Sequence, residues 1–521
     1  MSNIYKVKNG REALIGLIGA TTLALSGCTG SEDSLYSAEP AAPVYTEATA
    51  ASLATVSAAD YNDNEYGLIT GATLTNWIDD WAANKPAAID GELIILQVSD
   101  GALTDAVDAS CVDEDTDGTG VCKYFKPADG VRSYSLDSST WVETRDNGVT
   151  ETVSVVLSGE KMDALLAAYD IDPRSDMIVF AMGTGGGSQN MLMGRAHYLF
   201  RYWGAEAEHL AMLNGGATHA SVIPDGERGT YLGETNSGPA PTGGTVSVKD
   251  LYADNTVLQA TLGEMMAVAR GEVADTFVWD ARSPGEWSGD LYSTGGTGSI
   301  CQDVNDRDGD GALDTADRDG DGDTAEVEFL NCSTAMNGTV KGAVNLNFSD
   351  LLVSDDATED LNDSASVTGA DASYRYLDKA TLATMIETLG YTSGKTVYTY
   401  CRTTYRAMIT GTATGVILGY PTRYYDGAMI EWLQMASYQN VDGGLNLPAT
   451  SPWQTAALTD NLAYNDSAYV EVPAITNAFA SNTDKVVEAD RAYKTGSVDT
   501  TDSSDDGDSS GGATIPANPC G

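Results

Sequence analysis

The sequence predicts an α/β fold, because strand-like segments are followed by segments with helical periodicity. Residues 396–400 alternate β-favouring side chains, as a strand does. Residues 407–418 then repeat apolar side chains at helical spacing. Two earlier apolar runs, residues 93–98 and 176–182, have the composition of buried core strands.

The N-terminal residues 1–28 predict a signal peptide. Basic residues precede an apolar run at 13–20, and the segment ends in Leu-Ser-Gly-Cys. This ending resembles the bacterial lipobox, which implies that the sulfur of Cys28 is diacylated and that cleavage makes Cys28 the mature N-terminus. Thr29 follows where an inner-membrane retention signal usually has Asp, which implies an outer-membrane lipoprotein on the periplasmic face or the cell surface. The alternative is an ordinary secretory cleavage beside an incidental cysteine.

Length and charge limit the organisation of the chain and its partners. The 521 residues suffice for about three domain-sized units, or for two domains with long insertions and tails. The 28 Lys and Arg against 76 Asp and Glu give a formal net charge of −48, which excludes nucleic acid as a partner. Residues 29–65 and 495–521 are rich in small and polar side chains, so we expect a flexible tether and a disordered acidic tail. Contact with the membrane is therefore expected through the lipid anchor only.

The seven cysteines separate into different predicted roles. Two pairs bracket acidic segments and are predicted to form local disulfides in an oxidising envelope: Cys111 with Cys122, and Cys301 with Cys332. Cys520 lies in the predicted tail, where an incidental thiol is the favoured interpretation. Cys401 differs, because it lies between the predicted strand and helix and is followed by Arg402 and Arg406. Helix N-termini and basic neighbours favour the thiolate, so Cys401 is a candidate nucleophile rather than a buried inert cysteine.

Four motifs occur in order around Cys401. Residues 280–287 read Asp-Ala-Arg-Ser-Pro-Gly-Glu-Trp, residues 338–345 read Gly-Thr-Val-Lys-Gly-Ala-Val-Asn, residues 418–420 read Leu-Gly-Tyr, and residues 425–432 read Tyr-Asp-Gly-Ala-Met-Ile-Glu-Trp. In this order they resemble the motifs of the rhodanese (sulfurtransferase) family over residues 255–440, apart from an insertion. Thr339 and Lys341 stand where that family has His and Pro.

The first half of the chain resembles the same family more faintly. Residues 194–204 and 213–216 are similar to the Arg-Ala-x-x-x-Leu-x-x-x-Gly and Leu-x-Gly-Gly motifs of tandem rhodaneses, but the loop at 183–188 contains no cysteine. The resemblance implies two rhodanese-like domains, each a parallel sheet flanked by helices, of which the first lacks the catalytic cysteine. The expected ranges are an inactive domain at 66–220, a linker at 221–247, a catalytic domain at 248–440 with an insertion at 289–337, and an extension at 441–494 that wraps over both domains.

The insertion contains an Asp-rich segment, residues 303–328, that matches two overlapping registers of a twelve-residue calcium loop. Carboxylates at alternate positions around a glycine turn suit Ca²⁺ and would repel one another without it. The predicted ligands are Asp306, Asp308, Asp310, Asp314 and Asp317 in the first register, and Asp317, Asp319, Asp321 and Glu328 in the second. A solvated acidic loop is the alternative. We expect a structural Ca²⁺ that rigidifies the insertion together with the disulfide, and no organic cofactor.

The resemblance implies a sulfurtransferase. The Cys401 thiolate would take sulfane sulfur from a small sulfur-containing anion such as thiosulfate or a polysulfide, become a persulfide, and pass the sulfur to a thiol or cyanide. From Cys401 to Arg406 the spacing is Cys-x4-Arg, one residue shorter than the loop of tyrosine-phosphatase-like enzymes, which disfavours phosphate or arsenate chemistry.

The other candidate site residues have separate expected roles. Arg402 and Arg406 are candidates for holding an anionic donor, and Arg406 also for bracing the loop through a carboxylate. Thr403, Thr404 and Tyr405 complete the loop, and Asp280 and Arg282 are expected to organise the structure around it. Thr404 stands where most such loops have Gly, which predicts strain if the backbone there is left-handed.

An alternative from another class is a non-catalytic, lipid-anchored binding or assembly protein that accompanies an envelope redox complex. A cysteine–histidine protease pair is disfavoured, because the three histidines, at positions 197, 209 and 219, all lie in the first half.

Overall fold

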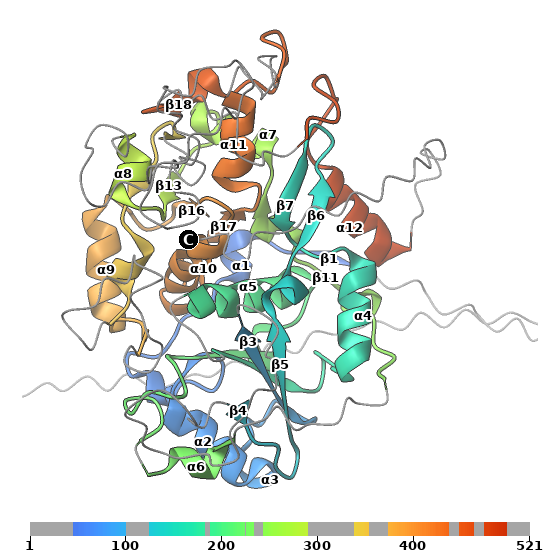
Figure 1. Ribbon diagram of the computed structural model, residues 1–521, viewed down its shortest axis with the longest axis vertical. Coiled ribbons are helices and arrows are strands. Elements are labelled where there is room, and N and C mark those ends of the chain that lie inside the picture. The colour runs from blue at the N-terminus through green and yellow to red at the C-terminus, as the bar shows by residue number, and fades with distance from the viewer. Residues whose placement is uncertain are drawn as a thin grey trace, which may run out of the picture. The chain divides into compact units, whose positions relative to one another are not determined.

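Two five-stranded parallel sheets organise the part of the chain that the computed structural model describes (Figure 1). The described residues are 45–99, 124–182, 188–224, 226–233, 243–289, 338–353, 373–436, 447–462 and 474–496. The first sheet has the order β2 (Gly67–Ile69), β9 (Leu210–Leu213), β8 (Met177–Met182), β3 (Leu93–Ser99) and β5 (Val131–Asp137). The second has the order β12 (Gln259–Ala260), β17 (Thr422–Tyr425), β16 (Thr396–Tyr400), β13 (Thr276–Asp280) and β15 (Val344–Asn345).

The two sheets share one strand order. When the five strands of each sheet are numbered along the chain, their spatial order from one edge to the other is first, fifth, fourth, second, third. All neighbouring strands within each sheet are parallel. The predicted α/β fold with parallel sheets flanked by helices is therefore confirmed, whereas the division into two rhodanese-like domains stays a prediction.

Helices follow most of these strands. Their bounds are α1 (Ala50–Leu53), α2 (Gly71–Asp79), α3 (Trp81–Asn84), α4 (Gly159–Tyr169), α5 (Ser188–Tyr202), α6 (Arg228–Tyr231), α7 (Leu262–Ala269), α8 (Pro284–Ser288), α9 (Lys379–Thr388), α10 (Tyr405–Gly411), α11 (Ala428–Ala436) and α12 (Lys485–Thr495). Short strands complete the described part: β1 (Thr46–Glu47), β4 (Tyr124–Phe125), β6 (Glu143–Asp146), β7 (Glu151–Val155), β10 (Leu232–Gly233), β11 (Ala253–Asp254), β14 (Thr339–Val340) and β18 (Thr459–Asp460).

Helices α5 and α10 join the two halves. Each follows the middle strand of its sheet, and the two pack directly against each other. Gly194 permits this close approach, because a Cβ there would lie 2.8 Å from the Cβ of Met408. All seven residues of α10 are buried, in a hydrophobic core that includes residues of both sheets. The halves therefore share one apolar core at this contact.

Three predicted strands are confirmed, and the structure adds detail to two other predicted segments. The runs at 93–98, 176–182 and 396–400 form β3, β8 and β16. The helix predicted over 407–418 is α-helical only as far as Gly411 and continues as a π-helix from Thr412 to Ile417. The segment predicted as a polar linker, 221–247, contains α6 and β10, and β10 pairs with β4.

The C-terminal extension packs on both halves. Strand β18 pairs with β14, beside the second sheet, and Asp490 of α12 forms a salt bridge of 2.7 Å with Arg145 of β6. Lys494 donates to the carbonyl of Trp203 at 2.7 Å and to the carbonyl of Ala253. The extension therefore contributes contacts to the shared core without forming a sheet of its own in the described residues.

Candidate functional site

Cys401 directly follows β16 and lies one loop before α10. Its side chain has no exposed surface, and it forms no disulfide. The loop that follows is short, so its backbone must turn sharply before the helix begins at Tyr405. Thr404 makes this turn with φ 67° and ψ −6°, in the left-handed region that disfavours a β-branched residue. The strain predicted for Thr404 is therefore present.

The N-terminus of α11 holds the backbone of this loop. The Met429 amide donates to the carbonyl of Cys401 at 3.0 Å, and the Ile430 amide donates to the carbonyl of Arg402 at 3.0 Å. Because carbonyl and N–H point in opposite directions across a trans peptide, the amides of residues 402 and 403 point away from α11. The Thr404 hydroxyl lies 3.0 Å from the carbonyl oxygen of Tyr425 and 3.1 Å from that of Asp426.

Arg406 is held by a buried carboxylate. Its two terminal nitrogens donate to Glu286 of α8 at 2.8 and 2.9 Å, and both side chains are buried. Burial alone would raise the pKa of Glu286, but the guanidinium of Arg406, assisted by Arg282, lowers this pKa to about 2. The sequence suggested that Arg406 braces the loop through a carboxylate, and Glu286 is that partner.

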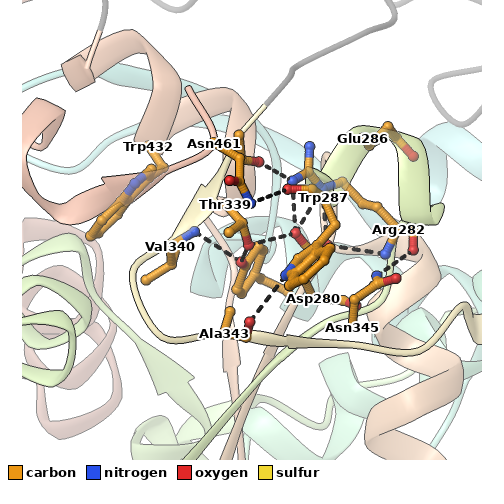
Figure 2. A network of polar contacts seen from close by, with 12 residues as sticks. Asp280, Arg282, Glu286, Trp287, Thr339, Val340, Ala343, Asn345, Trp432 and Asn461 are labelled. Carbon is orange, nitrogen blue, oxygen red and sulfur yellow. Dashed lines mark hydrogen bonds and ion pairs between the residues drawn. The ribbon is translucent and has the colours of Figure 1, made fainter. Parts of the chain in front are cut away.

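Asp280 and Arg282 form a fully buried pair beside the loop (Figure 2). Arg282 donates to Asp280 at 2.7 Å and also to the carbonyl of Gly338. The Thr339 hydroxyl bonds to Asp280 at 3.0 Å and lies 2.7 Å from the Tyr400 hydroxyl, one residue before Cys401. Asn345 donates to the carbonyls of Asp280 and Arg282 at 2.9 and 2.8 Å. The pair fixes the backbone around the loop and makes no contact with solvent.

A second buried ion pair links the loop to the first half of the chain. Both terminal nitrogens of Arg195, on α5, donate to the carboxylate of Asp426, one of them at 3.2 Å. The side chain of Arg195 is 1% exposed and that of Asp426 is 0% exposed. Asp426 also accepts from the Val156 amide at 2.8 Å. The carbonyl of Asp426 accepts from Thr404, so one residue connects α5 with the cysteine loop.

Glu431 strengthens the same junction. Its carboxylate accepts from Tyr425 at 2.7 Å and from two residues of the first half, Asn147 at 2.8 Å and Thr152 at 2.9 Å. Burial, and secondarily the nearby charge of Asp426, raises the pKa of Glu431. A Cβ at Gly427 would lie 2.2 Å from a Glu431 oxygen, so a side chain there would displace this carboxylate from its hydrogen-bond partners.

Strained backbone is concentrated around Asp426. Thr404, Ser154 and Ala428 have φ values of 67°, 61° and 52°. The Ser154 carbonyl accepts from Arg195, and Ala428 begins the helix that holds the loop. Each such conformation costs about 1–3 kcal/mol and persists only where its surroundings enforce it, which is a frequent property of functional sites.

Thr403 provides the remaining polar group of the loop. Its side chain is 4% exposed, and its hydroxyl has no hydrogen-bond partner among the described residues. Arg402 is partly exposed, and Tyr405 is buried. The structure therefore brings together all the predicted loop residues with Asp280 and Arg282.

Other predicted sites lie outside the described residues. These are Cys28, the two predicted disulfides and all the predicted calcium ligands. Within the described ranges, no cluster of three or more His, Cys, Asp or Glu side chains could hold a metal ion. No helix in those same ranges is long and apolar enough to cross a membrane.

No individual role was predicted for four further residues, although all of them lie in the motifs described above: Arg195, Glu286, Asp426 and Glu431. A local signal existed only for Glu286, since Ser283 and Glu286 have the spacing of a capping box, and the structure contains that box. The other partners are brought together only by the packing of the two halves.

Comparisons with known proteins find structural likeness only. No protein-family model and no curated protein matches the chain. An EanB variant in complex with ergothioneine is 13% identical with a TM-score of 0.41, covering 70% of this chain and 68% of that chain. The anaerobic ergothioneine biosynthesis enzyme of Chlorobium limicola, in complex with trimethyl histidine, is 14% identical with a TM-score of 0.40, covering 70% and 68%. YnjE is 16% identical with a TM-score of 0.38, and the likeness covers 70% of this chain and 66% of that chain.

These findings correct the family suggested by the motifs. The assignment to the tandem rhodaneses is wrong by these comparisons, because no family model matches and the structures found are named as ergothioneine-biosynthesis enzymes and YnjE. The four motifs cover few of the residues between 255 and 440, so by themselves they overstated the relationship. Function must be argued from the site itself.

Proposed function

We propose that the chain is a sulfur-transfer enzyme in which Cys401 carries sulfane sulfur as a persulfide. The Cys401 thiolate attacks the outer sulfur of thiosulfate, the sulfur–sulfur bond of the donor breaks, and sulfite leaves with the bonding electron pair. A thiolate or cyanide then attacks the terminal sulfur, and the thiolate of Cys401 is regenerated. No external oxidant or reductant is needed.

The observation that carries this proposal is the construction of the cysteine loop. A single cysteine stands at the carboxyl end of a central parallel strand, where ligands commonly bind in such sheets. The carbonyls of residues 401 and 402 are turned toward α11, so the amides of residues 402 and 403 point away from that helix, in the direction proposed for an anionic sulfur. The buried Thr403 hydroxyl, which lacks a partner in the described structure, is a further donor for that anion.

The two arginines have different proposed roles. Arg406 is occupied by Glu286 and keeps the loop in place. Arg402 is partly exposed and is the proposed contact for the negative charge of the donor. Because Cys401 is fully buried, the donor must be small and the loop must open briefly to admit it.

The test is thiocyanate formation from thiosulfate and cyanide. Wild type and a Cys520→Ser control should produce thiocyanate, and Cys401→Ser should lose at least about 99% of the activity, as expected for removal of a nucleophile. Arg402→Ala should mainly raise KM for thiosulfate. Equal turnover by Cys401→Ser and wild type would exclude the proposal.

Two further proposals concern the segments that the structure does not describe. We propose a structural Ca²⁺ bound by the Asp-rich segment 303–328 and a lipid anchor at Cys28 that places the protein at the outer membrane. The ligand chemistry supports the first and the lipobox-like sequence supports the second.

The second candidate function is a non-catalytic envelope binding or assembly protein. The complete burial of Cys401 favours it, because an unreactive structural cysteine is buried in the same way. Loss of an envelope redox complex in a strain lacking the protein, with full rescue by Cys401→Ser, would support this candidate over sulfur transfer.

A further inference from the structure

A cavity of about 30 Å³ is lined by helix α5, by the N-terminal segment 50–55 and by the π-helix that follows α10. Leu258 and Val416 contribute apolar surface, and none of residues 401–406 lines it. About 10–15 Å³ suffices for one water molecule, so the cavity has room for one or two waters or for one ion of similar size.

Arg201 lines this cavity and is the exception among the buried arginines. Four arginines of the described structure are buried, and three of them pair with a carboxylate: Arg195 with Asp426, Arg282 with Asp280, and Arg406 with Glu286. Arg201 is 8% exposed and forms no ion pair with any described residue. It donates to the carbonyl of Ala205 and, at 3.2 Å, to that of Leu53, which leaves three of its five N–H groups. A buried charge without a counter-ion is strongly destabilising.

The lining of the cavity supplies no negative charge to balance Arg201. No Asp or Glu is among the lining residues, although the chain contains 76 of them. Burial lowers the pKa of Arg201, and the charges of Glu208 and Glu206 act in the opposite direction. Both of these carboxylates are exposed, so their charges are screened by water.

His197 lies one helical turn before Arg201, on the same face of α5, and also lines the cavity. Its side chain is 8% exposed, and neither ring nitrogen has a hydrogen-bond partner among the described residues. Neither nitrogen is enclosed by protein atoms, so the ring keeps open polar surface. Burial, and secondarily the charge of Arg201, lowers the pKa of His197 to about 3. The imidazole is therefore neutral at neutral pH and carries one N–H donor.

We propose that the cavity binds one small monovalent anion, of the size of chloride, between the guanidinium of Arg201 and the N–H of His197. The nearby walls from Leu53, Leu258 and Val416 are apolar, and in such surroundings the attraction between opposite charges is stronger than in water. Thiosulfate is too large for this volume, so the site is separate from the sulfur chemistry at Cys401.

The experiment compares the melting temperature of the full chain in sodium chloride and in sodium gluconate at equal ionic strength. Gluconate does not fit the cavity, and equal ionic strength keeps the screening of the net charge of −48 unchanged. The measured quantity is the melting temperature in chloride minus that in gluconate. A bound anion stabilises the folded chain, so this difference should be at least about 2 °C larger for wild type than for variants that lack the site.

Two variants remove the site in different ways. Arg201→Gln removes the charge and retains a donor for the carbonyl of Ala205. Ala54→Leu fills the cavity from the half-buried N-terminal segment and changes no charge. Arg174→Gln removes an exposed charge outside the cavity and should behave as wild type. Because each protein is compared with itself in two salts, a lower overall stability of a variant does not obscure the result.

Broadening of the chloride nuclear magnetic resonance signal measures binding directly and should be larger for wild type than for Arg201→Gln. Equal melting differences in wild type, Arg201→Gln and Ala54→Leu would overturn the proposal, because the chloride effect would then arise elsewhere. Equal broadening by wild type and Arg201→Gln would overturn it as well, and would mean that the cavity holds water only.

Discussion

Asp426→Asn should destabilise the protein by about 3–5 kcal/mol, because it leaves the buried guanidinium of Arg195 without its counter-ion. The carboxylate is 0% exposed and accepts from both terminal nitrogens of Arg195 and from the Val156 amide. An asparagine retains one acceptor oxygen and directs an NH₂ group at one of these donors. The loss of stability therefore has two causes: the charge of Arg195 is no longer compensated, and at least one N–H donor faces the NH₂ group of the asparagine.

The assay is urea denaturation followed by tryptophan fluorescence. For a slope of about 4 kcal/mol/M, the midpoint should fall by about 1 M. Asp172→Asn is the matched control, because Asp172 pairs with Arg174 at the surface and should cost no more than about 1 kcal/mol. The Asp426 carbonyl also holds Thr404, so alkylation of Cys401 should become faster in Asp426→Asn only. A midpoint within about 0.2 M of wild type, which is the error of such fits, would refute the reasoning.

Three other predictions follow from the described structure and the sequence. Thr404→Ala should destabilise the protein by about 1–2 kcal/mol, because it keeps the left-handed backbone and loses the hydroxyl bonds, whereas Thr404→Gly should be closer to wild type in urea denaturation. Burial, with the charge of Arg201, lowers the pKa of His197 from 6.5 to about 3, so the neutral imidazole stabilises the fold fully above pH 6.5 and this stabilisation is lost as the pH falls. Between pH 7 and pH 5 the free energy of unfolding of the wild type should therefore fall by about 2 kcal/mol more than that of His197→Gln. Parallel pH profiles of the two proteins would contradict this. Excess chelator should lower the melting temperature of the full chain if segment 303–328 holds structural Ca²⁺, and an unchanged melt would exclude it.

The sequence predicted the parts of the fold that depend on local pattern. The apolar runs that became β3 and β8, and the alternation that became β16, are signals carried by neighbouring residues. Edge strands of two or three residues, such as β12 and β2, are too short to have a period and were not predicted. The change from α- to π-helix at Thr412 was also not predicted. In that stretch the Thr414 hydroxyl bonds back to the carbonyl of Thr410 at 3.0 Å, and such bonding often bends helices.

The candidate site was predicted as a list of loop residues and without its partners. Cys401, Arg402 and Arg406 were identified from their position between a strand and a helix. Glu286, which holds Arg406, is 120 positions away, and Arg195 is 231 positions from Asp426. Pairings of this separation depend on how the two halves pack, and no local pattern encodes them.

The most direct test of the central claim is the intact mass of the purified chain after incubation with thiosulfate, compared with Cys401→Ser. Persulfide transfer predicts a gain of one sulfur, about 32 Da, on wild type and not on the variant, and loss of that gain when cyanide is added. An unchanged wild-type mass, with Cys401 shown by alkylation under denaturing conditions to be a free thiol, would contradict the proposed sulfur transfer from thiosulfate.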